Sequence, residues 1–123
     1  MDAAKRQEMV DILGAAFGGA QDVTPAAAQP LHVLLDGLTL PQGWTPNPAR
    51  ALTVWASWPG GRPDFYVDHS VRGPDDQPPR SNSDAYLLGE TWRAFSFQFA
   101  WNGDDPVLAV QRWLTRFDKE RAA

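Results

Sequence analysis

The strongest structural signal in this chain is the alternating segment from Ala51 to Trp58. One row of side chains is Leu52, Val54, Ala56 and Trp58, and the other is Thr53, Trp55 and Ser57. A period of two places successive side chains on opposite faces of a β-strand. The turn-forming run Pro59-Gly60-Gly61 follows at once. The pattern therefore predicts a strand over 51–58 that buries Val54.

Other short apolar runs predict further strands. Leu31–Leu35 is followed by the turn signal Asp36-Gly37, and Asp64–Val67 follows the Pro-Gly turn. Short strands at this spacing form antiparallel meanders. The segment Phe95–Phe99 also alternates, as a strand or an extended loop does.

The N-terminal region carries a helical pattern. Met9, Leu13 and Phe17 recur every four residues, which is the spacing of one helix face. Gly18-Gly19 is suited to end such a helix. The pattern predicts a short amphipathic helix over about 3–17.

A second helix is predicted near the C-terminus. Asp105 is suited to cap it, and Pro106 fits its first position, where a missing N–H costs nothing. The helix is expected to run to about Lys119. Its predicted apolar stripe comprises Val107, Leu108, Val110, Leu114 and Phe117.

The order of these elements predicts an α+β domain. A helix, an antiparallel β-meander of three to four strands, a polar loop and a second helix would form it. We expect a single domain, with a helix in 1–19, a linker without regular structure in 20–30 and the main body in 31–119. The loop from Arg72 to Ala85 is long, and such loops often carry function. The expected core includes Val54, Phe65, Val67, Trp101, Leu108 and Leu114.

Composition narrows the chemistry. The 123 residues include no cysteine, which excludes thiol nucleophiles, cysteine-ligated zinc and iron–sulfur clusters. The formal net charge is −4, whereas nucleic-acid-binding domains carry basic patches, so no nucleic-acid partner is expected. No apolar stretch reaches the ~18 residues of a membrane span, and Glu8 and Asp11 interrupt any secretion signal. We expect a cytoplasmic protein without a membrane partner.

Few residues are placed to support catalysis. Asp68-His69-Ser70 has the residue types of a hydrolase triad, but neighbours in an extended chain point to opposite faces. A metal would have only His32 and His69 beside carboxylates, and His32 lies in an apolar run. Gly18-Gly19 and Gly60-Gly61 lack the spacing of a phosphate-binding loop. No catalytic residue, metal or cofactor is therefore predicted.

Two stretches carry more specific motifs. WPGGRPDFYV, from Trp58 to Val67, has an aromatic–Pro pair, a second Pro and then an alternating strand. Trp92-Arg93-Ala94-Phe95-Ser96 precedes WNGDDPVLAVQRWL, from Trp101 to Leu114. These motifs and their order resemble the ubiquitin-conjugating (UBC) family, most closely its bacterial branch called prokaryotic family E. The resemblance covers roughly residues 31–117 and implies a UBC-like fold.

The chain departs from that family at the reacting group. Conjugating enzymes carry ubiquitin as a thioester on a cysteine, whose place falls here around Glu90–Arg93, and Thr91 is a hydroxyl there. An alcohol without a positioned base is a poor nucleophile. The family's His-Pro-Asn is also missing. Thioester transfer is therefore excluded. The resemblance implies a non-catalytic module whose partners are a ubiquitin-like protein, an activating enzyme or a JAB-type peptidase of a bacterial conjugation system.

The binding surface is predicted from the aromatic excess and the long loop. Six Trp and six Phe fit an aromatic core, or a surface that uses some of them to anchor a partner. Trp92 is the expected anchor. Candidate partner-binding residues are Glu90, Thr91, Trp92, Arg93, Asp75, Asp76 and Arg80. The alternatives are a hydrolase or transferase that uses Thr91 or His69, and a purely structural subunit of a larger complex.

Overall fold

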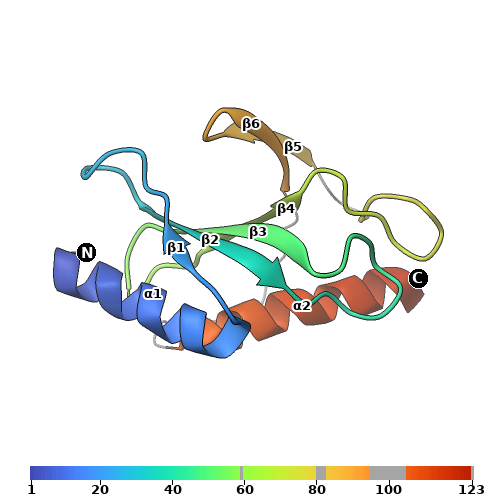
Figure 1. Ribbon diagram of the computed structural model, residues 1–123, viewed down its shortest axis with the longest axis horizontal. Coiled ribbons are helices and arrows are strands. Elements are labelled where there is room, and N and C mark those ends of the chain that lie inside the picture. The colour runs from blue at the N-terminus through green and yellow to red at the C-terminus, as the bar shows by residue number, and fades with distance from the viewer. Residues whose placement is uncertain (59, 80–82, 95–104, 123) are drawn as a thin grey trace.

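The computed structural model describes residues 1–58, 60–79, 83–94 and 105–122. In this part of the chain the fold is α+β, with two helices and one six-stranded antiparallel sheet (Figure 1). The elements are α1 (Ala3–Phe17), β1 (Gln21–Asp22), β2 (Leu31–Leu38), β3 (Ala49–Trp55), β4 (Asp64–Asp68), β5 (Ser83–Leu87), β6 (Glu90–Ala94) and α2 (Pro106–Ala122).

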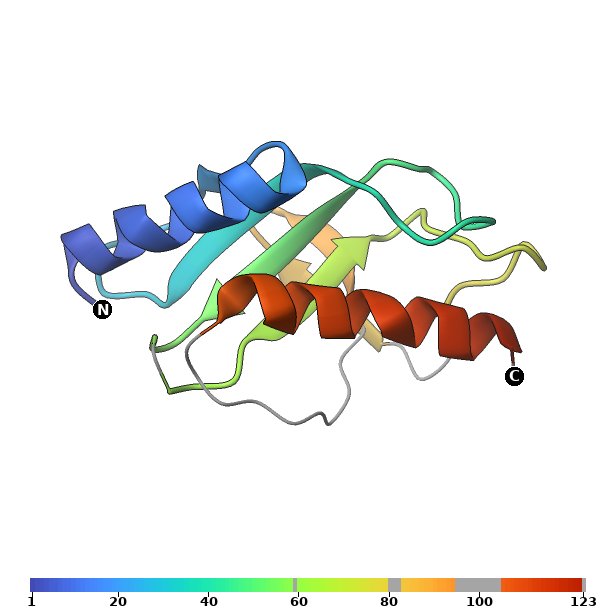
Figure 2. The same ribbon diagram turned by 90° about the horizontal axis from the view of Figure 1, so that it is seen from below.

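The molecule has two layers. The strands are ordered β1-β2-β3-β4-β6-β5, and each neighbouring pair is antiparallel. Both helices cover the same face of the sheet (Figure 2), and the β5–β6 hairpin turns away from the helical layer (Figure 1). None of the described helices is both long enough and apolar enough to cross a bilayer.

Both helices begin where the sequence predicts. The Asp2 carboxylate accepts from the Lys5 amide at 2.8 Å, and Gly18, with φ 83°, closes α1 by donating to the Gly14 carbonyl. A glycine adopts this left-handed conformation without steric cost. Asp105 caps α2, because its carboxylate accepts from the Leu108 amide at 3.2 Å. Local capping chemistry therefore sets both starts, while α2 runs to Ala122 rather than to about Lys119.

The buried face of α2 differs from the predicted stripe. Val110 and Phe117 are buried as predicted, but Leu108 and Leu114 are only half-buried. Trp113 occupies the centre of the face instead. Its ring stacks on Phe65 with centroids 4.9 Å apart and an interplanar angle of 13°. The helix is therefore rotated about its axis relative to the prediction, with Trp113 in the core. Its buried residues are Pro106, Ala109, Val110, Trp113 and Phe117.

The predicted burial of Val54 in the central strand is also wrong. Ala51, Thr53 and Trp55 face the helical core, whereas Val54 is half-exposed on the opposite face. A buried polar group costs stability unless it is hydrogen-bonded. Here Trp55 Nε1 donates to Thr53 Oγ1 at 2.8 Å, and that hydroxyl donates to the Val33 carbonyl at 3.3 Å. These bonds let a threonine and a tryptophan take the core face.

Two predictions about the region of β1 and β2 are wrong. Asp36-Gly37 does not form a turn but lies inside β2, where Leu35 pairs with Ala51 and Leu38 with Ala49. The extra residue is accommodated as a bulge, which needs no chain reversal. The 20–30 linker contains the short strand β1, whose two residues pair with β2.

The polar loop is shorter than expected. β5 begins at Ser83, inside the stretch assigned to the loop, and its hairpin with β6 raises the sheet to six strands instead of three or four. The turn residues Leu88 and Gly89 have φ values of 54° and 79°. Two positive φ values are typical of a type I′ turn, whose twist matches that of paired strands. The predicted segment Phe95–Phe99 and core residue Trp101 lie outside the described residues.

The core lies between the helices and the sheet. Phe65 and Val67 are 1% and 0% exposed, as predicted. The rings of Trp113 and Phe117 meet edge-on with centroids 5.3 Å apart, and those of Phe117 and Trp44 meet edge-on with centroids 5.0 Å apart. This aromatic chain joins β4, α2 and the segment after β2 into one cluster, to which Met9 and Leu13 of α1 also belong.

Candidate functional site

The predicted binding segment forms strand β6 and is divided between two faces. Side chains alternate along a strand. Trp92 is paired with Asp68 across the sheet, and Arg93 with Val67. Glu90 and Trp92 therefore share one face of the hairpin, and Thr91 and Arg93 the other. The four residues do not make one continuous surface.

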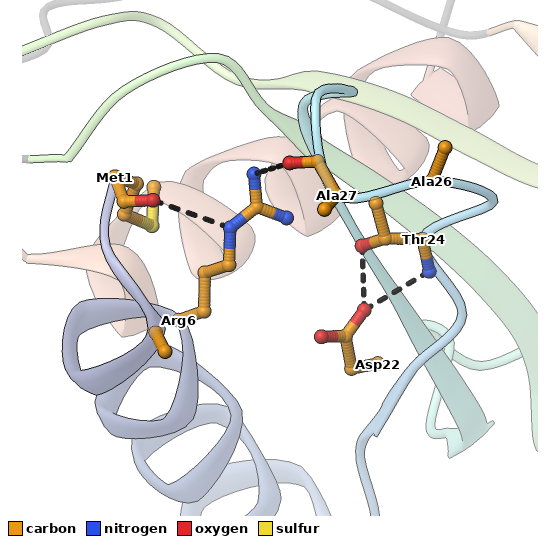
Figure 3. Close-up of a pocket in the computed structure, with 7 residues that line it drawn as sticks. Met1, Arg6, Asp22, Thr24, Ala26 and Ala27 are labelled. Carbon is orange, nitrogen blue, oxygen red and sulfur yellow. Dashed lines mark hydrogen bonds between the residues drawn. The ribbon is translucent and has the colours of Figure 1, made fainter.

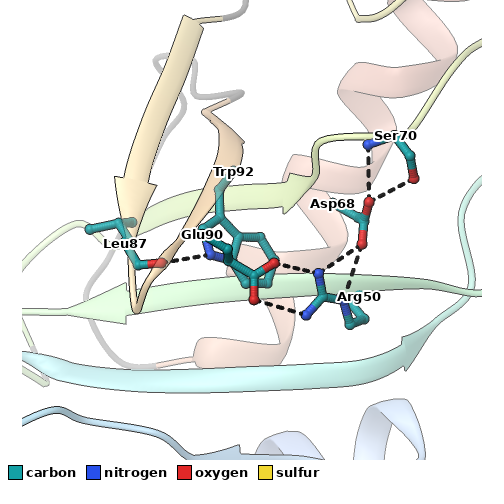
Figure 4. Close-up of polar contacts among 6 residues, drawn as sticks. All are labelled: Arg50, Asp68, Ser70, Leu87, Glu90 and Trp92. Atoms are coloured by element: carbon teal, nitrogen blue, oxygen red, sulfur yellow. Dashed lines mark hydrogen bonds and ion pairs between the residues drawn. The ribbon is translucent and has the colours of Figure 1, made fainter.

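Trp92 is buried rather than exposed. Only 1% of it is accessible, and its Nε1 donates to the Leu87 carbonyl at 3.2 Å across the hairpin turn (Figure 4). The Arg50 guanidinium lies 4.9 Å from the ring centroid. Trp92 therefore holds the hairpin against the sheet, and the expectation of an exposed aromatic anchor at this position is wrong.

Arg50 links three strands at this place. Its Nε and Nη2 donate to Asp68 Oδ2 at 3.1 and 3.0 Å, and its Nη1 and Nη2 donate to the Glu90 carboxylate at 3.2 and 2.6 Å (Figure 4). The hydrogen bonds to Glu90 are the main reason that the pKa of Arg50 is raised. Burial acts to raise the pKa of Asp68, but bonds from Ser70 and Arg50 lower it overall. The group is a charged clamp between β3, β4 and β6.

The opposite face of the hairpin carries a second polar group. His69 Nε2 lies 2.9 Å from Asp84 Oδ1, and Arg93 Nη1 lies 3.7 Å from the same oxygen. Arg93 and Arg72 both donate to the His69 carbonyl, at 3.1 and 3.0 Å. Burial first, and the neighbouring Arg72 second, lower the pKa of Arg93. These contacts join the end of β4 to the hairpin.

The arrangement does not assemble a nucleophile with a base. Ser70 Oγ donates to Asp68 Oδ1 at 2.6 Å, whereas the His69 imidazole is hydrogen-bonded to Asp84. Thr91 is exposed and lies opposite Tyr86 in the hairpin. Within the described ranges, no serine or threonine hydroxyl is hydrogen-bonded to a histidine ring. The hydrolase or transferase alternative thus gains no geometric support. The same part of the chain holds no group of three metal-ligating side chains.

The predicted acidic residues lie in a different place. Asp75 and Asp76 belong to the loop after β4, where Asp75 Oδ1 accepts from the Gln77 amide at 3.1 Å. That loop closes on itself through the bond from the Gly73 amide to the Gln77 carbonyl. No described hydrogen bond or ion pair joins these acids to the hairpin. Arg80 lies outside the described residues.

The hairpin tip presents a feature that the sequence analysis missed. Tyr86 is 74% exposed and Leu88 is 39% exposed, and they are the two large apolar side chains that the described chain leaves exposed. Together with Thr91 they form what we call the tip surface. The sequence signal was the run Tyr86-Leu87-Leu88-Gly89, an apolar stretch that ends at a turn-forming glycine.

A shallow pocket of about 490 Å³ lies between the start of α1 and the β1–β2 connection (Figure 3). Arg6 donates there to the carbonyls of Met1, Ala27 and Gln29, the last at 2.7 Å. Burial acts to raise the pKa of Asp22, but the hydrogen bonds from Thr24 lower it overall. The hydrogen bonds of Arg6 therefore attach α1 to the β1–β2 connection.

No protein-family model matches the chain. No curated protein and no solved structure matches it either.

Proposed function

We propose that the chain is a non-catalytic UBC-like module in the bacterial cytoplasm that positions a ubiquitin-like protein, or an enzyme that acts on one. The motifs in 58–67 and 92–96 support this proposal from the sequence. The order of α1, the antiparallel strands β2, β3 and β4, and a later helix supports it from the structure. The absence of cysteine separates the module from thioester chemistry.

The exposed tip surface is the observation that carries the binding role. Tyr86 and Leu88 project at the end of a hairpin that Trp92 and Arg50 hold in place. Exposed aromatic and aliphatic side chains on a fixed support are typical interface anchors. The matching partner surface is therefore an apolar pocket that receives Tyr86 and Leu88.

Leu88 supports this role through its backbone. A bulky residue at φ 54° is unusual, because its Cβ crowds the neighbouring carbonyl. Glycine or asparagine would occupy that turn position at lower cost. Neither local conformation nor burial thus favours leucine here, whereas contact with a partner does.

Leu88→Asn separates stability from binding. Asn-Gly is a preferred type I′ pair, so the variant is expected to raise the free energy of unfolding by about 1 kcal/mol. Urea melts followed by tryptophan fluorescence measure this change. The same variant is expected to weaken partner binding by about 2 kcal/mol if Leu88 is an anchor. Ala16→Asn, at an exposed site on α1, is the surface control and should leave binding unchanged.

A reconstituted conjugation system tests the function itself. The chain, an activating enzyme, ATP and the ubiquitin-like protein encoded beside that enzyme are incubated together, and adducts are resolved with and without thiol. We expect no thiol-labile adduct and a noncovalent complex of roughly micromolar affinity, which shifts the NMR signals of the tip surface. A hydroxyl-linked adduct that disappears in Thr91→Ala would overturn the non-catalytic role. An absence of binding at millimolar concentrations would refute the module.

A further inference from the structure

The two edges of the sheet are protected differently. β1 is one edge, and its two residues offer almost nothing to pair with. β5 is the other edge and runs for five residues without proline, lysine or a register shift. Native edge strands usually avoid association by being short, kinked or charged. Among the described residues β5 pairs only with β6, so its outer edge has none of these protections except Asp84.

Asp84 does not protect this edge strongly. Its carboxylate lies 2.9 Å from His69 Nε2 and 3.7 Å from Arg93 Nη1 within the same chain. A charge paired in this way repels an approaching strand less than an isolated carboxylate does. The neighbouring edge residue Tyr86 is 74% exposed and apolar over most of its surface. Within the described residues, the edge therefore combines backbone groups that have no strand partner with an exposed aromatic ring.

The hairpin geometry shows which backbone groups face outward. Leu87 and Glu90 flank a two-residue turn and form a hydrogen-bonded pair, after which bonded and non-bonded pairs alternate. The N–H and C=O groups of 83, 85 and 87 thus point to β6. Those of Asp84 and Tyr86 point away from it and form the row available to a new strand.

We propose that two copies of this chain pair through β5, antiparallel and with Ala85 on the twofold axis. In this register Asp84 of one copy lies opposite Tyr86 of the other, and the two residues exchange N–H···O=C bonds. The symmetry repeats the pair, so four backbone bonds form. Ala85 faces its own copy at a non-bonded position, where side chains approach most closely and a methyl group fits.

The self-complementary register about Ala85 supports a second copy as the occupant. The register places each Asp84 opposite a tyrosine and not opposite the other Asp84, which avoids a destabilising like-charge pair. It also covers part of Tyr86, which is 74% exposed in the single chain. A five-residue strand pair is a small interface, so we expect half-association at roughly 10–100 µM. Because Tyr86 belongs to both surfaces, dimerisation and the proposed partner binding should compete.

Sedimentation equilibrium of the purified chain tests the pairing. Runs over roughly 1 µM to 1 mM cover the range in which weak dimers form. Wild type should pass from monomer to dimer. Tyr86→Pro should stay monomeric, because proline removes the outward N–H while leaving the bonds to β6. Tyr86→Thr, which keeps that N–H, should still dimerise with roughly 2- to 30-fold weaker affinity, since two side-chain pairs are lost.

Hydrogen exchange gives a second readout that needs no variant. In wild type the Asp84 and Tyr86 amides should be protected at high concentration and lose protection on dilution, while those of Ala85 and Leu87 stay protected throughout. A wild type that remains monomeric to 1 mM would overturn the proposal. So would a dimer that forms equally well in folded Tyr86→Pro, or one whose Asp84 and Tyr86 amides exchange at the same rate at all concentrations.

Discussion

Replacing Trp113 by alanine is expected to lower the free energy of unfolding by about 3–5 kcal/mol. The side chain is fully buried, stacks on Phe65 and meets Phe117 edge-on. Truncation removes the largest apolar side chain of α2 from the core and leaves a cavity between the helix and β4. Because small domains are stable by about 5–15 kcal/mol, the loss is a large share of the total. Urea denaturation followed by far-UV circular dichroism measures it.

Leu114→Ala is the matched control on the same helix. Leu114 is the next residue in the chain but is only half-buried, so its truncation is expected to cost about 1 kcal/mol. Helix propensity changes little between these residues and alanine. Equal losses in the free energy of unfolding for Trp113→Ala and Leu114→Ala would contradict the observed orientation of α2. They would instead support the predicted apolar stripe that includes Leu114.

Arg50→Met is expected to lower stability by about 2 kcal/mol at pH 7. Methionine keeps much of the aliphatic stem but leaves Asp68 and Glu90 as neighbouring carboxylates without the cation between them. All three side chains are partly exposed, at 37%, 21% and 41%, so water moderates the loss. The contact between the guanidinium and the Trp92 ring accounts for a further share.

The effect of Arg50→Met should depend on pH. The pKa of Asp68 is lowered in the folded state from an ordinary value of 3.8. A group with a lowered folded pKa stabilises the fold above its unfolded pKa, and that stability is lost as the pH falls through the folded value. The difference between wild type and variant should therefore shrink below about pH 4. A difference that is the same at pH 3 and pH 7 would assign the loss to packing alone.

Glu90→Gln provides the control for the clamp. It removes one carboxylate charge and keeps both bonds from Arg50 to Asp68. Glu90 is the more exposed acid of the two, so the expected loss is under about 1 kcal/mol. A loss of stability as large as that of Arg50→Met would mean that the Glu90 charge is the main stabilising group of the clamp.

The parts of the fold that the sequence predicted well depend on contacts between close neighbours. α1 spans Ala3–Phe17 as expected, because Gly18 supplies the left-handed residue that ends it. α2 begins at Pro106 because Asp105 precedes it. The strand at Asp64–Val67 also appears where the alternation placed it. In each case the deciding interaction lies within about one helical turn or a few strand residues.

The candidate site was predicted less well, because its geometry depends on residues distant in the chain. Sequence marked the segment Glu90–Arg93 but not the hairpin partner β5, since a polar loop and a short edge strand have similar composition. Trp92 is buried because Arg50, from another strand, covers its ring. Nothing near Trp92 in the sequence indicates that cover, so the sequence did not predict that Trp92 is buried.

The sequence by itself determined the α+β class, both helix starts, the meander strands and the exclusion of thioester chemistry, because caps, periodicity and residue inventory are local properties. Tertiary structure alone decided which face of each amphipathic element is buried. Thr53 and Trp55 face the core, where they are hydrogen-bonded to each other and Thr53 is bonded to β2. Trp113 faces the core, where its ring stacks on Phe65. The hairpin likewise takes its place from Arg50, Asp68 and Glu90, which three separate strands bring together. Packing and charge pairing between distant segments are satisfied only once the sheet has formed, and they leave Tyr86 and Leu88 exposed at its far edge.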